Sequence, residues 1–114
     1  MSLRPESKKY LFDALTAAER IATFVDGRNF ESYQSSNMLK SAVERQFEII
    51  GEALSQLGKA DPAALTLVNE YARIIAFRNI LIHRYAGVDD RLVWDVIQTK
   101  LEPLTQQLHA LLDQ

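Results

Sequence analysis

The segment RNILIHRY, residues 78–85, is the most informative stretch of this chain. It continues the apolar run IIAF at residues 74–77, and Gly87 and Asp89 then interrupt the pattern. An Arg, an Asn, a His and a Tyr therefore lie within two helical turns of a segment that is otherwise suited to a protein core. Polar groups that a fold buries need partners or serve a function. We therefore expect the rest of the chain to hold this segment against a second copy of itself.

The composition is that of one globular domain. The chain has 114 residues, which suits a single domain covering residues 1–114. There are no cysteines, so disulfides and thiolate metal sites are excluded and the reducing cytoplasm is the simplest location. No apolar run approaches the roughly 20 residues of a membrane span, and the N-terminus lacks the pattern of a signal peptide. We expect a cytoplasmic protein that does not contact a membrane.

The formal net charge of the chain is −2. Proteins that bind nucleic acids without specificity are usually basic, because neutralising phosphates drives their affinity. The total charge therefore argues mildly against RNA or DNA as a partner, but it leaves room for a local basic site. Basic residues do cluster around the central segment: Arg73, Arg78, His83, Arg84 and Arg91.

Apolar residues spaced by three and four predict helices in the first half of the chain. The first helix is expected to start near Pro5 and to end at Gly27, with a polar connector over residues 28–35. The second is expected to start at residue 36 or 37 and to close at Gly58. Inside it, Gly51 is expected to allow close approach of a neighbouring backbone.

The second half predicts three further helices. A short one follows the Asp–Pro pair at residues 61–62 and extends to about residue 68, and a third main helix covers residues 71–83 and carries the motif. The last is capped by Asp89 or Asp90, and Pro103 is expected to kink or interrupt it. No strand pattern or repeat is present. The sequence therefore predicts an all-α, four-to-five-helix, up-and-down bundle.

Three charged residues of the second predicted helix, Arg45, Glu48 and Glu52, are spaced by three, four and seven. This spacing is typical of a solvated face stabilised by pairs within the helix. The alternative is that these residues help to hold the motif in place.

The motif residues divide between two helix faces. At about 100° per residue, Arg78 and Tyr85 share one face, and Asn79 and His83 share the face beside it. Arg78 and His83 are five residues apart, so on a regular helix they diverge by about 140°. They converge if the last turn opens, or if two chains share the site.

Taken one at a time, the motif residues have ordinary explanations. The His can cap a helix, the Arg can be an ion-pair partner, and the Tyr can be a core ring with a solvated hydroxyl. Together they suit phosphate chemistry, because Arg78 offers a planar charged fork and His83 can move protons. Asn79 can orient the His or donate to a phosphate oxygen. We expect neither a metal nor a cofactor, because two distant histidines and no cysteine make a poor ligand set.

The order Arg, four residues, His, one residue, Tyr resembles the signature of the HepT-like toxins of the HEPN superfamily. The likeness covers nearly the whole chain, and the pieces that carry it lie within residues 10–25, 42–53 and 77–94. Two departures occur: Tyr71 stands where such proteins often have Trp, and Ala76 where Gly is common. Both are packing changes, and neither lies within the motif.

This resemblance implies an all-α HEPN-type homodimer in which the two motif helices face each other. It also implies a metal-independent ribonuclease that is the toxin of a type VII-like toxin–antitoxin pair. The implied antitoxin is a minimal nucleotidyltransferase, which transfers AMP to Tyr85, silences the nuclease, and can join the dimer in a hetero-oligomer. The implied catalytic residues are Arg78 and His83, with Asn79 positioning the RNA.

Two other functions remain open. One is a non-catalytic HEPN module that uses Arg78 and Tyr85 to bind a nucleotide or a nucleotidyltransferase. The other is a purely structural dimer in which the motif residues engage only one another.

Overall fold

Helices make up almost all of the structure, a computed structural model that describes residues 3–83 and 87–113. Within these ranges there are six helices and no strand, so the predicted all-α class is confirmed, with one helix more than expected. They are α1 (Pro5–Val25), α2 (Phe30–Gln34), α3 (Asn37–Ala60), α4 (Pro62–Leu65), α5 (Tyr71–Ile82) and α6 (Asp90–Leu112).

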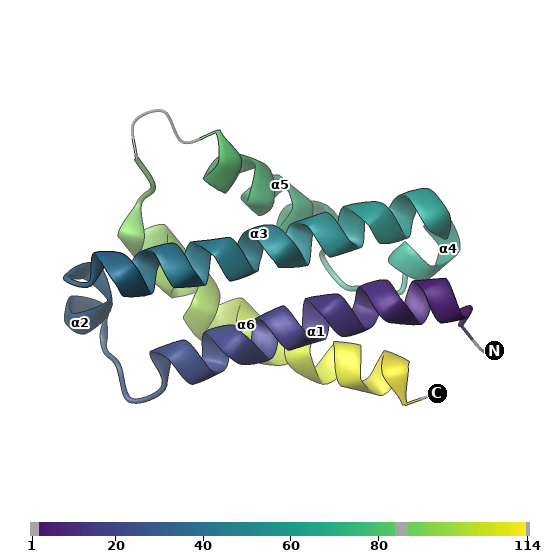
Figure 1. Ribbon diagram of the computed structural model, residues 1–114, viewed down its shortest axis with the longest axis horizontal. Coiled ribbons are helices and arrows are strands. Elements are labelled where there is room, and N and C mark those ends of the chain that lie inside the picture. Colours follow the sequence, from purple (N-terminus) through teal and green to yellow (C-terminus); the bar gives the residue numbers. More distant parts are fainter. Residues whose placement is uncertain (1–2, 84–86, 114) are drawn as a thin grey trace.

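Figure 1 shows how the long helices are arranged. α1 and α3 lie side by side, and α6 crosses behind them. α5 packs on α3, on the side away from α1. The motif helix is therefore supported mainly by one neighbour, α3. None of the helices in the described ranges combines the length and the apolar character that crossing a membrane requires.

The additional helix, α2, lies where the sequence predicted a polar connector. Its start is stabilised by a reciprocal pair of hydrogen bonds: the Ser32 N–H donates to Asn29 Oδ1 at 2.9 Å, and the Asn29 N–H donates to Ser32 Oγ at 3.0 Å. Tyr33 then points into the core, where its ring centroid lies 5.4 Å from that of Trp94. The prediction missed a helix that is defined by its cap and by one buried ring.

The end of α3 also differs from the prediction. Gly58 was expected to close this helix, but α3 continues to Ala60. A Cβ at position 58 would lie 2.7 Å from Leu65 Cδ2, so this glycine makes room for packing instead of ending the helix. Asp61 then caps α4, its Oδ1 accepting from the Ala64 N–H at 3.2 Å, and α4 ends at Leu65, three residues earlier than expected.

The last helix is continuous. Asp89 caps α6 by accepting from the N–H groups of Arg91 and Leu92 at 2.9 and 3.3 Å, as predicted. Pro103 was expected to kink or interrupt the helix, but α6 runs through it to Leu112. Buried side chains on both sides of the proline hold the two segments against the same core, and these are Ile97, Leu101, Leu108 and Leu111.

Candidate functional site

Arg78 is held where α5 crosses α3. Next to it in sequence, Phe77 is buried and packs edge-on against Phe47 of α3, with 5.2 Å between ring centroids. Beside this contact, the aliphatic stem of Arg78 lies over Gly51, where an added Cβ would be 2.3 Å from Arg78 Cβ and 2.6 Å from Arg78 Cγ. A close approach at Gly51 is therefore present, but the approaching group is the side-chain stem of the motif arginine, whereas a neighbouring backbone was predicted.

The head of Arg78 is oriented by two acceptors. Its Nη2 donates to Glu52 Oε2 at 2.5 Å, and its Nη1 donates to Asn79 Oδ1 at 3.0 Å. The Glu52 carboxylate is itself held, because its Oε1 accepts from Gln56 Nε2 at 3.1 Å. The Arg78 side chain is 26% exposed, so part of this oriented guanidinium reaches solvent.

The third nitrogen of this guanidinium is enclosed. Arg78 Nε is buried and has no hydrogen-bond partner within the described residues. Packing around Nε and the stem therefore limits how the group turns, while the two terminal nitrogens carry its polar contacts.

The charged residues of α3 divide between the two interpretations. Arg45 pairs with Glu48 within the helix at 3.4 Å, as the solvated-face interpretation predicts. Glu52 instead bridges to α5 and Arg78, which is the alternative, a residue that holds the motif. Sequence spacing could not choose between them, because the contact joins positions 26 residues apart.

His83 marks the end of α5. Its backbone N–H still donates to the Asn79 carbonyl at 3.0 Å, but its φ of −101° and ψ of 33° leave the helix. The ring is exposed, and within residues 3–83 and 87–113 it forms no hydrogen bond or ion pair with Arg78 or any other side chain. A single chain thus brings Asn79 to Arg78 but does not join His83 to them.

The predicted modification site, Tyr85, lies outside the described residues, as does Arg84. The shared face of Arg78 and Tyr85 was predicted for a regular helix, and within the described residues α5 ends at Ile82.

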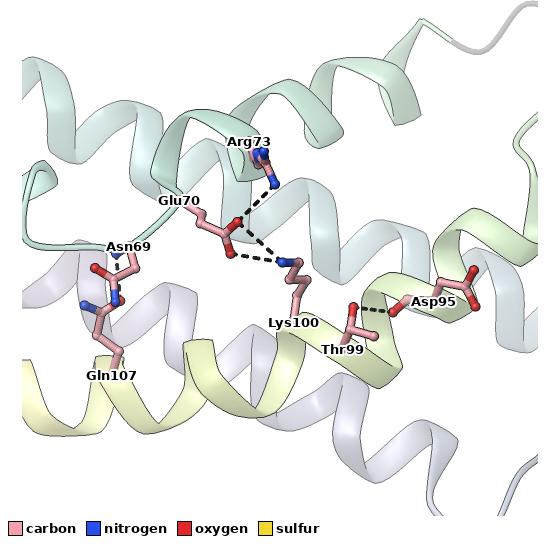
Figure 2. A network of polar contacts seen from close by, with 7 residues as sticks. All are labelled: Asn69, Glu70, Arg73, Asp95, Thr99, Lys100 and Gln107. Atoms are coloured by element: carbon pink, nitrogen blue, oxygen red, sulfur yellow. Dashed lines mark hydrogen bonds and ion pairs between the residues drawn. The ribbon is translucent and has the colours of Figure 1, made fainter.

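A polar network fixes the opposite end of α5 to α6 (Figure 2). The Glu70 carboxylate accepts from Arg73 Nη1 at 3.2 Å and from Lys100 Nζ at 3.3 Å. Nearby, the Gln107 side chain accepts from the Asn69 N–H and donates to the Leu67 carbonyl, both at 2.8 Å. The sequence did not indicate this network, because its contacts with α6 join positions 30 to 40 residues apart.

Beyond this network, α5 and α6 enclose an apolar cavity of about 550 Å³. Its walls include Ile74, Ile80, Leu92 and Val96. Two of these remain exposed, Ile80 by 52% and Leu92 by 41%. Ile80 and Arg78 belong to the same helix, but at about 100° per residue they point to different sides of it, and Arg78 does not line the cavity.

Metal ligands do not gather in this region. Among residues 3–83 and 87–113, no three His, Cys, Asp or Glu side chains lie close enough together to hold a metal ion. The groups that meet at Arg78 are its guanidinium, the Asn79 amide and the Glu52 carboxylate.

Comparison with known proteins shows the family of the chain. The sequence model of HepT-like ribonucleases matches residues 14–111, which include every helix that supports Arg78. The chain belongs to the HepT-like ribonuclease family. RNA is the substrate class that membership of this family implies.

Three family relatives match the chain over most of their length. A protein of Caldanaerobacter subterraneus, provisionally named an RNase, is 32% identical over 105 residues, covering 92% of this chain and 93% of the relative. A Thermococcus cleftensis protein, provisionally named ribonuclease HepT, is 30% identical over 109 residues, covering 96% and 98%. A Methanocaldococcus jannaschii protein, also provisionally named an RNase, is 28% identical over 101 residues, covering 89% and 92%. No solved structure shows a significant match.

Proposed function

We propose that this protein is a metal-independent RNA endonuclease in which Arg78 and His83 act on the phosphodiester and Asn79 positions it. The observation that carries the proposal is the geometry of Arg78, whose stem lies over Gly51 and whose partly exposed head is oriented by Glu52 and Asn79. A guanidinium held in this way offers a planar, permanently charged fork to a phosphate. Membership of a ribonuclease family supports RNA as the source of that phosphate.

RNA can be cut without a metal because it carries its own nucleophile. The 2′-hydroxyl attacks the adjacent phosphorus and the bond from phosphorus to the 5′-oxygen breaks, leaving a 2′,3′-cyclic phosphate and a 5′-hydroxyl. One group must accept the proton of the 2′-hydroxyl and another must protonate the leaving oxygen, and His83 is the residue of the motif that can do either. Arg78 stabilises the negative charge that grows on the phosphate oxygens.

This mechanism requires two chains. One chain supplies a single His83 in the motif, and its ring does not contact Arg78. A two-fold dimer places identical groups opposite each other, so a second chain provides the second proton-transfer group. We therefore propose a homodimer that meets through α5, the motif helix.

The apolar surface beside the motif supports this dimer. Ile80 and Leu92 are exposed at a cavity that runs along α5, and α5 packs mainly on α3 alone. Contiguous exposed apolar surface marks an interaction site on a protein. Because Ile80 and the motif residues belong to the same helix, a second copy of α5 that covered this surface would bring the two motif helices close together.

The biological role we propose is that of a cytoplasmic toxin in a toxin–antitoxin pair. The proposed antitoxin is a minimal nucleotidyltransferase that transfers AMP to Tyr85, two residues after His83. The adenylate adds about one negative charge and a bulky group close to the motif, where it would compete with substrate phosphate.

Mass spectrometry tests this role. After incubation with ATP and a minimal nucleotidyltransferase encoded next to the gene of this protein, the chain should carry one added AMP, which Tyr85→Phe abolishes. Modification elsewhere with equal inhibition would overturn this role.

RNA cleavage by the purified protein in EDTA tests the nuclease itself. Arg78→Ala and His83→Ala should each slow cleavage by about 100-fold or more while the helical circular dichroism spectrum stays unchanged, because both side chains are partly or fully exposed. Loss of one stabilising donor can cost ~3 kcal/mol of transition-state stabilisation, a factor of about 100 in rate. If folded His83→Ala cleaves RNA as fast as the parent, the mechanism is wrong. Nucleotide binding without any cleavage would favour the non-catalytic module.

A further inference from the structure

Glu52 contacts the motif through Arg78 but has no part in the proposed proton transfers. Its Oε2 accepts from Arg78 Nη2 and its Oε1 accepts from Gln56 Nε2 at 3.1 Å. Both oxygens of this carboxylate are therefore engaged, one within α3 and one across to α5. A carboxylate tied on both sides is suited to hold a neighbour and poorly suited to carry protons.

We infer that Glu52 is the positioning residue that directs the Arg78 guanidinium toward the RNA phosphate. This inference rests on the proposed function. Gly51 leaves space for the stem of Arg78 and the adjacent Glu52 holds its head, so two consecutive residues of α3 determine where the arginine lies and how it turns.

The hydrogen-bond capacity of Arg78 shows what this orientation leaves available. A guanidinium has five N–H donors, one on Nε and two on each terminal nitrogen. Nε is buried, one donor of Nη2 is used by Glu52, and one donor of Nη1 is used by Asn79. One N–H therefore remains on each terminal nitrogen. That pair matches the two non-bridging oxygens of a phosphodiester.

The exposure of the Glu52 and Arg78 side chains indicates that their ion pair orients Arg78 and adds little to the stability of the fold. The Glu52 side chain is 50% exposed and that of Arg78 is 26% exposed. Exposed ion pairs contribute little to folding stability. Removing the Glu52 carboxylate should therefore leave the fold intact, while the head of Arg78 loses one of its two restraints.

Loss of a positioning residue should lower kcat without raising KM. Without Glu52 the guanidinium is no longer partly neutralised, so RNA should bind as tightly as before or more tightly, but fewer bound molecules have the productive orientation. We expect Glu52→Ala to lower kcat by about tenfold or more with KM unchanged or lower. Glu52→Gln keeps a hydrogen-bond acceptor for Nη2 and should restore most of the loss in kcat.

The experiment measures kcat and KM in EDTA with a fluorophore–quencher RNA pool of random sequence. Because Glu52 acts through Arg78, the double variant Arg78→Ala/Glu52→Ala should be no slower than Arg78→Ala alone. Glu102→Ala is the matched control, since Glu102 accepts from Gln106 at 3.3 Å just as Glu52 accepts from Gln56, one turn along the same helix. This control should leave both kinetic constants at the parent values. An unchanged kcat in Glu52→Ala, or losses that multiply in the double variant, would overturn the inference.

Nitrogen-15 NMR of the arginine side chains separates this inference from the proposed function. A guanidinium held at both ends should show distinct Nη1 and Nη2 signals for Arg78, which merge in Glu52→Ala and stay distinct in Glu102→Ala. A single averaged signal in the parent would show that Glu52 does not hold Arg78, whatever the nuclease assay gives. Failure of the parent to cleave RNA, with distinct signals, would overturn the nuclease and leave the positioning contact supported.

Discussion

At the scale of single residues, the site depends on the absence of a side chain at Gly51 as much as on the side chains around it. Gly51 and Gly58 lie two turns apart on α3, and at both positions an added Cβ would be closer than 3 Å to another residue. The neighbours differ. At Gly51 it is the Cβ and Cγ of Arg78, close to the backbone of α5, whereas at Gly58 it is the tip of the Leu65 side chain.

This difference predicts unequal effects of alanine at the two positions. In Gly51→Ala, α5 itself must move, and overpacking of this kind lowers the free energy of unfolding by ~1–3 kcal/mol. In Gly58→Ala, Leu65 can turn away, and the gain in helix propensity of up to ~1 kcal/mol offsets the cost. Urea denaturation of both variants measures the contrast. If Gly51→Ala proves as stable as Gly58→Ala, then α5 does not depend on this close approach.

At the scale of elements, one aspartate joins the ends of three helices. Asp61 caps α4 directly after α3, and its Oδ2 accepts from the buried Ser7 Oγ of α1 at 2.7 Å. Arg4 adds an ion pair to the same oxygen at 3.6 Å. The hydrogen bond from Ser7, and after it the one from the Ala64 backbone, lower the pKa of the Asp61 carboxyl.

The lowered pKa predicts how stability depends on pH. Because the folded state favours the ionised carboxylate, Asp61 stabilises the fold above the ordinary aspartate pKa of ~3.9, and this contribution is lost as the pH falls through the lower folded-state value. Asp61→Asn should therefore have a lower melting temperature than the parent at pH 7, and the gap should shrink below pH ~4. Thermal melts followed by circular dichroism from neutral to acidic pH check this.

A matched substitution sharpens the test. Asp13→Asn removes a carboxylate that pairs with Lys9 one turn away on the exposed side of α1. Exposed pairs of this kind contribute little, so the melting temperature of this variant should follow that of the parent at each pH. A gap between Asp61→Asn and the parent that stays constant down to the most acidic pH would contradict the role assigned to the carboxylate.

At the scale of the whole molecule, α5 and α6 present an apolar face around the 550 Å³ cavity. The network of Glu70, Arg73 and Lys100 holds these helices together at one end (Figure 2). The apolar wall of the cavity remains exposed at Ile80. The proposed dimer would bury this wall and complete the nuclease site in the same step.

The proposed dimer predicts that a single charge introduced at Ile80 prevents the two chains from associating. Ile80→Glu should convert the protein to a monomer and remove RNA cleavage, because a carboxylate at a buried dimer interface lacks a partner. The side chain is 52% exposed in the single chain, so the fold of each chain should survive. Sedimentation velocity at micromolar concentration, together with the cleavage assay, measures both effects.

Met38→Glu is the control for this prediction. Met38 is 84% exposed near the start of α3, and it does not line the cavity. The variant should keep the association state and activity of the parent. A parent that sediments as a monomer, or an Ile80→Glu variant that remains a dimer, would place the interface elsewhere or remove it.

Much of the fold followed from the sequence alone, because the signals that define a helix are local. The spacing of apolar residues located the four long helices, and caps such as Asp61 and Asp89 marked where helices begin. The order of Arg78, His83 and Tyr85 also indicated the family, which the match over residues 14–111 confirms. The errors arose where packing overrides local preference: a glycine inside α3, a proline inside α6, and a short helix that is held by Tyr33.

Only the tertiary structure decided how the site is built. Glu52 and Arg78 are 26 residues apart, and two interpretations of the charged face fitted the sequence equally until α5 lay across α3. At the same crossing, the aliphatic stem of Arg78 packs over Gly51. α5 ends at Ile82, and the next residue, His83, is exposed. Local spacing determines which side chains share a helix face, whereas contacts between helices depend on how the chain folds back on itself. The sequence therefore specified the residues of the candidate site, and the packing of α5 on α3 specified which of them touch.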